Sequence, residues 1–212
     1  MENPFPILVA ATAVMLVPFI VVSLTAFIKI AVVLFLVRSA LGVQQTPPNL
    51  VLYGVTIVLT AYVSAPIFQA AYGELITLNA DLSSPDTWPL AYERAIIPIR
   101  EFLFRFTEES DRAFFLQAAQ ELHSDTDVAL NEDDMFILAP SFVTAELTKA
   151  FEIGVLIYLP FIVIDIVVTN ILTALGMIMV SPLVISLPFK LLLFVAADGW
   201  TRLMHGLVLS YA

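Results

Sequence analysis

The strongest constraint on this chain is a set of long runs of uncharged, mostly apolar residues. Residues 5–28 and residues 50–73 each span 24 positions without a charged side chain. Between residues 153 and 197, the charged side chains are Asp165 and Lys190 alone. A helix needs about 20 mostly apolar residues to cross a bilayer. The runs therefore predict four spans, at about residues 7–37, 50–72, 153–179 and 183–206.

Composition and charge support a membrane protein with one polar segment. Hydrophobic residues make up 60% of the 212 positions and charged residues 13%, whereas soluble domains usually have about 45–50% and about 25%. Residues 74–134 carry 14 acids and four bases, and the rest of the chain carries five of each. This pattern excludes a nucleic-acid-binding surface, which needs clustered Lys and Arg. The absence of cysteine excludes disulfides and thiolate metal sites.

Two turns divide the apolar runs into hairpins. The connector at residues 39–49 contains Pro47 and Pro48, and the turn at residues 176–182 begins with Gly176 and ends with Pro182. The second turn has no charge, so we expect it to be buried in protein or to line a narrow passage. We predict an all-α membrane protein with a first hairpin at 1–72, an acidic helical insert at 73–138 and a second hairpin at 139–212.

The acidic insert shows helical spacing of apolar residues. We expect one helix to bury Ile99, Phe102, Leu103 and Phe106, and a second, at about residues 110–122, to bury Phe114, Phe115, Ala118 and Leu122. Arg38 lies beside the first connector, which places that connector in the cytoplasm by the positive-inside rule. Four spans then put the insert and both termini in the periplasm. We expect the first run to be retained, because it is too long for a signal-peptide core.

No pattern typical of an enzyme occurs in the sequence. It lacks a phosphate-binding loop, a zinc-protease helix and a nucleophile elbow. The two histidines, His123 and His205, lie far apart in sequence. We therefore expect no catalytic residue, no metal site and no cofactor.

Four charged residues lie within the apolar runs: Lys29, Asp165, Lys190 and Asp198. A charge at the bilayer centre costs at least about 2.5–3.5 kcal/mol, so it indicates function by default. At 1.5 Å per residue, we place the lysines about 12–14 Å and the aspartates about 22–24 Å from the predicted turns. This offset disfavours pairing within one straight hairpin and favours pairing between subunits. We interpret these charges as assembly salt bridges, with a proton relay as the alternative.

Two further groups of side chains are candidates for contacts. Glu146, Lys149 and Glu152 alternate in sign at i,i+3 spacing, which is typical of modest intrahelical pairs and less so of a partner-binding face. Met177 and Met179 lie in the uncharged turn. Methionine commonly fills gaps in apolar cores, but it also suits a soft constriction that blocks water and ions.

Several strings of residues stand out along the chain. They are RSALGVQQTPPN at 38–49, PSFVTAELTKAFEIG at 140–154, ALGMIMVSP at 174–182, ISLPFKL at 185–191 and DGW at 198–200. The first string carries a turn signature of Arg38, Gly42, Gln44, Gln45, Pro47 and Pro48. Together the strings resemble the SctR/FliP family, also called YscR, SpaP and HrcR. Because long strings agree in order and spacing over well over half of the chain, the resemblance is specific.

The resemblance implies a core subunit of a type III secretion export gate in the bacterial inner membrane. Five copies would assemble with SctS/FliQ-like and SctT/FliR-like subunits at the centre of the basal body, with an SctU/FlhB-like subunit around the entrance. Unfolded proteins would pass through the middle. The family's methionine-rich gasket maps onto Met177, Ile178 and Met179, and Ile178 stands where relatives often carry a third methionine.

The resemblance favours the injectisome branch over the flagellar export gate, which remains an alternative. A proton-coupled transporter that uses Asp165 or Asp198 is a second alternative, although no repeated halves are evident. A third is a membrane-anchored receptor or docking module formed by the insert.

Overall fold

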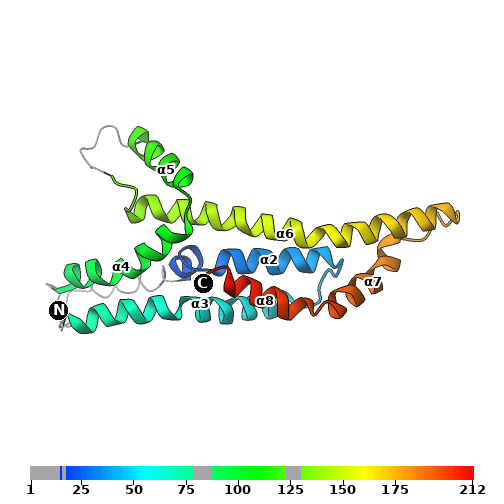
Figure 1. Ribbon diagram of the computed structural model, residues 1–212, viewed down its shortest axis with the longest axis horizontal. Helices are drawn as coiled ribbons and strands as arrows, with labels where there is room; N and C mark the ends of the chain where they lie inside the picture. Colours follow the sequence, from blue (N-terminus) through cyan, green and yellow to red (C-terminus); the bar gives the residue numbers. More distant parts are fainter. Residues whose placement is uncertain (1–14, 16–17, 79–86, 123–129) are drawn as a thin grey trace, which may run out of the picture. The chain divides into compact units, whose positions relative to one another are not determined.

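The computed structural model describes residues 15, 18–78, 87–122 and 130–212, and this part of the chain is helical without strands. Figure 1 labels the helices. They are α2 (Phe27–Ala40), α3 (Asn49–Thr77), α4 (Trp88–Phe106), α5 (Glu109–Leu122), α6 (Met135–Ala174), α7 (Pro182–Ala196) and α8 (Gly199–Leu209). The predicted all-α membrane protein is therefore confirmed.

Among the described residues, two helices are long and apolar enough to cross a membrane. They are α3, with 29 residues, and α6, with 40 residues. The pair α7 and α8 also meets this criterion when taken as one span, but it bends by 60°. The second predicted span is confirmed as α3, whereas the third begins at Met135 rather than near residue 153. The fourth is broken at Ala197 and Asp198, and residues 7–14, 16 and 17 of the first lie outside the described residues.

The first helical segment is interrupted at a place that the sequence analysis did not predict. Residues 18–23 are helical, residues 24–26 form a bend, and α2 follows. The hydroxyl of Thr25 accepts a hydrogen bond from the backbone N–H of Phe27 at 3.4 Å. Threonine hydroxyls commonly satisfy the free N–H groups at helix starts in this way. A local side-chain hydrogen bond thus accompanies the break.

The described residues cluster into two compact units, and α3 and α6 each contribute to both. The first unit comprises residues 1–28 and 64–146, and the second comprises residues 29–63 and 147–212. These units do not coincide with the predicted segments 1–72, 73–138 and 139–212, because each unit draws residues from more than one segment. The three segments stay predictions.

The first unit has a small apolar core built by α4 and the start of α6. Leu103, Leu138 and Phe142 are fully buried, and Phe102 and Phe106 pack against them. The predicted inward face of the helix at 99–106 is thus confirmed.

Helix α5 begins within one residue of the predicted start and ends as predicted. Its predicted buried face is wrong for Phe114 and Leu122, which are largely exposed, whereas Phe115 and Ala118 are half-buried. Arg112 is buried instead, because it donates to the carbonyl and hydroxyl oxygens of Thr107 and lies 3.5 Å from the carboxylate of Glu132.

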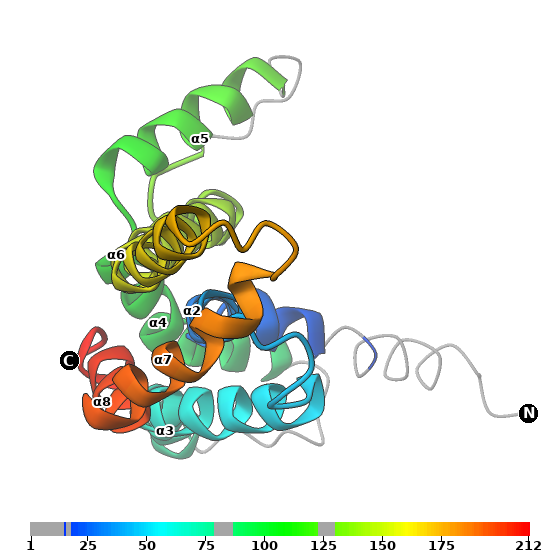
Figure 2. The same cartoon turned by 90° about the vertical axis from the view of Figure 1, so that its right-hand side faces the viewer.

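In the second unit, α2 is the central element. Figures 1 and 2 show it between α6 and the layer formed by α3 and α8. Its side chains Ile30, Val33, Leu34 and Val37 are almost completely buried. Gly154 of α6 lets α6 approach α2 closely, because a Cβ at that position would collide with the side chain of Leu36. This unit holds the uncharged turn and all four charges found within the apolar runs, Lys29, Asp165, Lys190 and Asp198.

Candidate functional site

The uncharged turn between α6 and α7 is fixed by its own backbone. The N–H of Met177 donates to the carbonyl of Leu172 at 2.9 Å, and the N–H of Gly176 donates to the carbonyl of Thr173 at 3.0 Å. Gly176 has a φ of +73°. Together these features form a Schellman motif, in which glycine adopts the left-handed conformation after the last helical turn. The sequence Leu-Gly-Met therefore ends α6 at a defined place.

The tip of this hairpin consists of exposed apolar side chains. Met177 is 44% exposed, Ile178 is 88% exposed and Met179 is fully exposed. Proline and serine at the end of the turn start α7, with Pro182 at its first position. The predicted gasket residues thus lie together at one end of the hairpin. In an isolated chain, no neighbouring protein covers the apolar side chains of this tip.

Below the tip, a partly buried ion pair joins α6 to α7. The ammonium of Lys190 lies 2.6 Å from Oδ2 of Asp165, and the hydroxyl of Ser186 donates to Oδ1 of the same carboxylate at 2.6 Å. The Lys190 side chain is 3% exposed and that of Asp165 is 36% exposed. Ser186 and Lys190 are four residues apart, so they share one face of α7. Both oxygens of the carboxylate are therefore held by one helix.

The expected offset between Asp165 and Lys190 is wrong. The prediction ended the third span at about residue 179, five residues after the observed end of α6 at Ala174. In the structure, α6 ends at Ala174, nine residues after Asp165, and Lys190 comes eight residues after Pro182. At 1.5 Å per residue, both side chains lie about 12–14 Å from the helix ends. They therefore stand level and pair within one chain.

Lys190 also reaches the end of α2. Its ammonium donates to the carbonyl of Ala40, the last residue of that helix, at 3.2 Å. The carbonyls of a final helical turn have no partner within the helix, and a lysine can satisfy them. Sequence reasoning missed this contact, because the two residues are 150 positions apart.

The first connector packs against the start of α7. Gly42 has a φ of +78°, and a Cβ at this position would lie 3.3 Å from Leu183 and 3.8 Å from Leu187. Arg38 fixes the other side of the connector through hydrogen bonds to the carbonyl of Pro47 at 3.2 Å and to Oδ1 of Asn49 at 2.6 Å. Of the remaining turn-signature residues, Gln44, Gln45 and Pro48 are exposed.

The other two charges within the apolar runs occupy different places. Lys29 is buried in α2, and its ammonium lies 3.6 Å from the ring centroid of Tyr211, a cation–π contact. Asp198 is the residue at the break between α7 and α8, with a φ of 53°, and it accepts a hydrogen bond from the hydroxyl of Thr201 at 3.0 Å. Aspartate tolerates this left-handed conformation better than most residues. Asp198 is therefore a helix-break residue rather than a charge inside a helix.

Glu146, Lys149 and Glu152 lie in the interior of α6 rather than at the start of a span. Their surroundings differ, because Glu146 is fully buried, Lys149 is half-buried and Glu152 is exposed. The three side chains thus do not present one uniform charged face.

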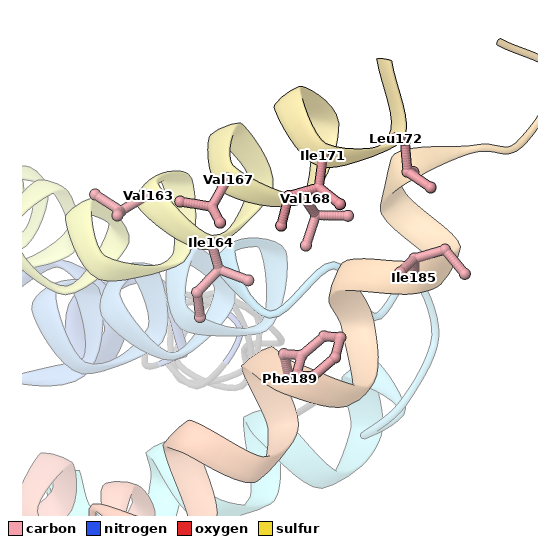
Figure 3. Close-up of a pocket in the computed structure, with 8 residues that line it drawn as sticks. All are labelled: Val163, Ile164, Val167, Val168, Ile171, Leu172, Ile185 and Phe189. Carbon is pink, nitrogen blue, oxygen red and sulfur yellow. The ribbon is translucent and has the colours of Figure 1, made fainter. Parts of the chain in front are cut away.

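A wholly apolar groove of about 450 Å³ runs along the hairpin between α6 and α7 (Figure 3). Val163, Val167 and Ile171 of α6 and Ile185 and Phe189 of α7 are among the side chains that line it. This groove suits an apolar neighbour. Among the described residues, no three His, Asp or Glu side chains gather as a metal site would require, and His123 lies outside them.

Comparison with known proteins gives consistent matches over nearly the whole chain. A model described as the FliP family matches residues 10–207. The chain is 52% identical over 192 residues to the probable translocation protein y4yL of Sinorhizobium fredii, with 90% of this chain and 86% of the relative covered. It is 47% identical over 209 residues to the Yop proteins translocation protein R of Yersinia pestis, with 97% and 95% covered. It is 46% identical over 209 residues to the hypersensitivity response secretion protein HrcR of Ralstonia nicotianae, with 97% and 96% covered.

Proposed function

The chain belongs to the FliP family, and on that premise we propose that it is a core, channel-forming subunit of a type III secretion export gate. The observation that carries the proposal is the hairpin of α6 and α7, whose uncharged tip exposes Ile178 and Met179. Membership of the family implies association with other components of the export apparatus. The family resemblance inferred from the sequence strings is confirmed.

The exposed apolar surfaces of the second unit support a role within an assembly. The tip, the groove of Figure 3 and the outer face of α6 all present large apolar side chains, and Phe151, Val155 and Leu156 continue this surface. Contiguous exposed apolar surface of this kind marks contact with lipid or with other protein chains. A ring of such tips would form an apolar constriction, which can exclude water and ions.

The family resemblance implies the copy number, the partner subunits, the transported proteins and the location. Five copies assemble with SctS/FliQ-like, SctT/FliR-like and SctU/FlhB-like subunits, and unfolded proteins pass through the shared channel without any enzymatic step in this chain. The protein is a membrane protein, and we place it in the bacterial inner membrane as a multi-pass subunit with the acidic insert in the periplasm. The names of the relatives, which refer to translocation and to hypersensitivity response secretion, favour the injectisome branch.

Coexpression tests the assembly. The chain is expressed with its SctS/FliQ-like and SctT/FliR-like partners and purified in mild detergent, and its mass is measured. We expect a large complex that contains several copies of this chain. A monomer under these conditions would refute the proposed function.

Conductance tests the gasket. We expect the double variant Met177→Gly and Met179→Gly to make the resting gate leak small ions, because it removes two flexible apolar side chains from the tip. The control is Met177→Leu with Met179→Leu, which keeps the apolar volume and should stay closed. Unchanged conductance in the glycine variant would count against a gasket.

We propose a static role for Asp165 rather than proton transfer. Both of its oxygens accept hydrogen bonds, from Ser186 and Lys190. Neutralising Asp165 should therefore impair assembly. An intact assembly that loses pH-dependent flux would instead support a proton-coupled transporter.

A further inference from the structure

We propose that Lys190 is a positioning residue that fastens α7 to the end of α2 and thereby sets the position of the hairpin tip. The consequence for channel closure rests on the proposed function. The contact itself is a property of the second unit alone, so the two can be tested separately.

The first observation is that Lys190 joins three helices through one ammonium group. It contacts Asp165 of α6 at 2.6 Å and the carbonyl of Ala40 of α2 at 3.2 Å, and its own backbone lies in α7. Its side chain is almost completely buried. A buried ammonium must keep its partners, because charge without compensation is costly in the protein interior. The three helices are thus held to one point.

The second observation is that the packing around this point leaves little freedom. The space beside Gly42 is filled by Leu183 and Leu187 of α7, and the Lys190 ammonium would lie 3.9 Å from a Cβ at position 42. One face of α7, at positions 183, 187 and 190, therefore meets the connector that follows α2. Apolar packing and the polar contact act at the same place.

The third observation is that the tip has few restraints of its own. The backbone N–H groups of residues 175–178 and 180 bond to carbonyls of the turn and of the last turn of α6, and the side chains of Ile178 and Met179 are exposed. Lys190 lies eight residues after Pro182, about 12 Å along α7. A movement of α7 at Lys190 is therefore transmitted to the tip.

The contact with the Ala40 carbonyl gives Lys190 a role that an ion pair with Asp165 alone would not have. An ion pair between α6 and α7 survives exchange of its two charges. The contact with Ala40 does not, because a carbonyl oxygen accepts hydrogen bonds and repels a carboxylate. Exchange of Asp165 and Lys190 thus restores the pair and removes the attachment to α2.

The test measures the distance between the connector and the tip. The chain has no cysteine, so Gln45→Cys and Met179→Cys introduce two spin labels at exposed sites of the second unit. The labelled full chain is coexpressed with the partner subunits and with an excess of unlabelled copies, so that pulsed electron spin resonance reports distances within one chain. Lys190→Met is compared with Lys190→Arg, with the exchange Asp165→Lys/Lys190→Asp, and with Arg202→Met as an exposed control in α8.

We expect one narrow distance in the parent, in Lys190→Arg and in Arg202→Met. We expect loss of that narrow distance in Lys190→Met and in the charge exchange. The same two changes in the unlabelled chain, which keeps Met179, should make the assembled gate leak ions. A narrow distance in Lys190→Met, or its recovery in the charge exchange, would overturn the proposal.

A second variant covers the case in which Lys190→Met does not fold. Gly42→Ala leaves both charges in place and strains the packing against Leu183. We expect it to lose the narrow distance, and an unchanged distance would again overturn the proposal. Copurification with the partner subunits is recorded for every variant. Failure of the parent to copurify refutes the proposed function, whereas the distance measured on that same chain still decides the role of Lys190.

Discussion

Removing either member of the buried ion pair should destabilise the isolated chain, but by unequal amounts. The two perturbations are Asp165→Leu and Lys190→Met, each of which replaces a charged side chain by an apolar one. The Lys190 side chain is 3% exposed, and the Asp165 side chain is 36% exposed. The residue left behind therefore meets a different environment in each variant.

The magnitudes follow from what each variant leaves unpaired. In Asp165→Leu, the buried ammonium keeps the neutral carbonyl of Ala40 as its partner, and loss of one charged partner of a buried pair costs about 3–5 kcal/mol. In Lys190→Met, the remaining carboxylate still accepts from Ser186 and reaches solvent. We expect that variant to lose about 1–2 kcal/mol, mainly the hydrogen bonds of the ammonium. The double variant should regain at least about 2 kcal/mol over Asp165→Leu, because no buried charge is left without a partner.

Reversible unfolding of the purified chain in mixed detergent micelles measures these differences, with helix content followed by circular dichroism. Asp165→Leu should be the less stable single variant, and the two substitutions should be strongly non-additive. Equal losses, or a larger loss in Lys190→Met, would refute this expectation, because either result would mean that the exposed side of Asp165 is not solvated.

Three glycines give contrasting predictions in the same unfolding assay. Gly154→Ala should lose about 1–3 kcal/mol, because the added methyl collides with Leu36; a neutral result would mean that α2 and α6 are not in close contact. Gly54→Ala, in open space within α3, should gain about 0.5–1 kcal/mol from the higher helix propensity of alanine, and it serves as the control. Gly176→Ala has no steric conflict but requires a φ of +73°, so it should lose about 1–2 kcal/mol, and Gly176→Asn should lose less.

Much of the fold could be predicted from the sequence because the signals are local. Long uncharged runs predicted helices in an apolar environment, and α3 and α6 confirm them. The bounds of α5 were predicted to within one or two residues from apolar spacing and a polar start. The family was also accessible, since its strings occur in order along the chain.

The side-chain environments were harder to predict because they depend on neighbours that are distant in sequence. The burial of Arg112 in place of Phe114 depends on Thr107 and on Glu132 in the segment before α6. The break at Asp198 has no proline, and the absence of a Cβ at Gly199 makes room for the ring of Phe194. The pairing of Asp165 with Lys190 was misjudged because the end of α6 was placed too late in the chain.

The sequence by itself determined that this chain forms apolar helices joined by uncharged turns and that it belongs to one secretion family, because hydrophobicity and backbone preferences act over a few neighbouring residues. Only the tertiary structure decided which charges meet. A hydrogen bond between Lys190 and Ala40 links positions 150 residues apart, and no local preference specifies that contact. Helix packing brings the two groups together, and the cost of an uncompensated buried charge then keeps them in contact.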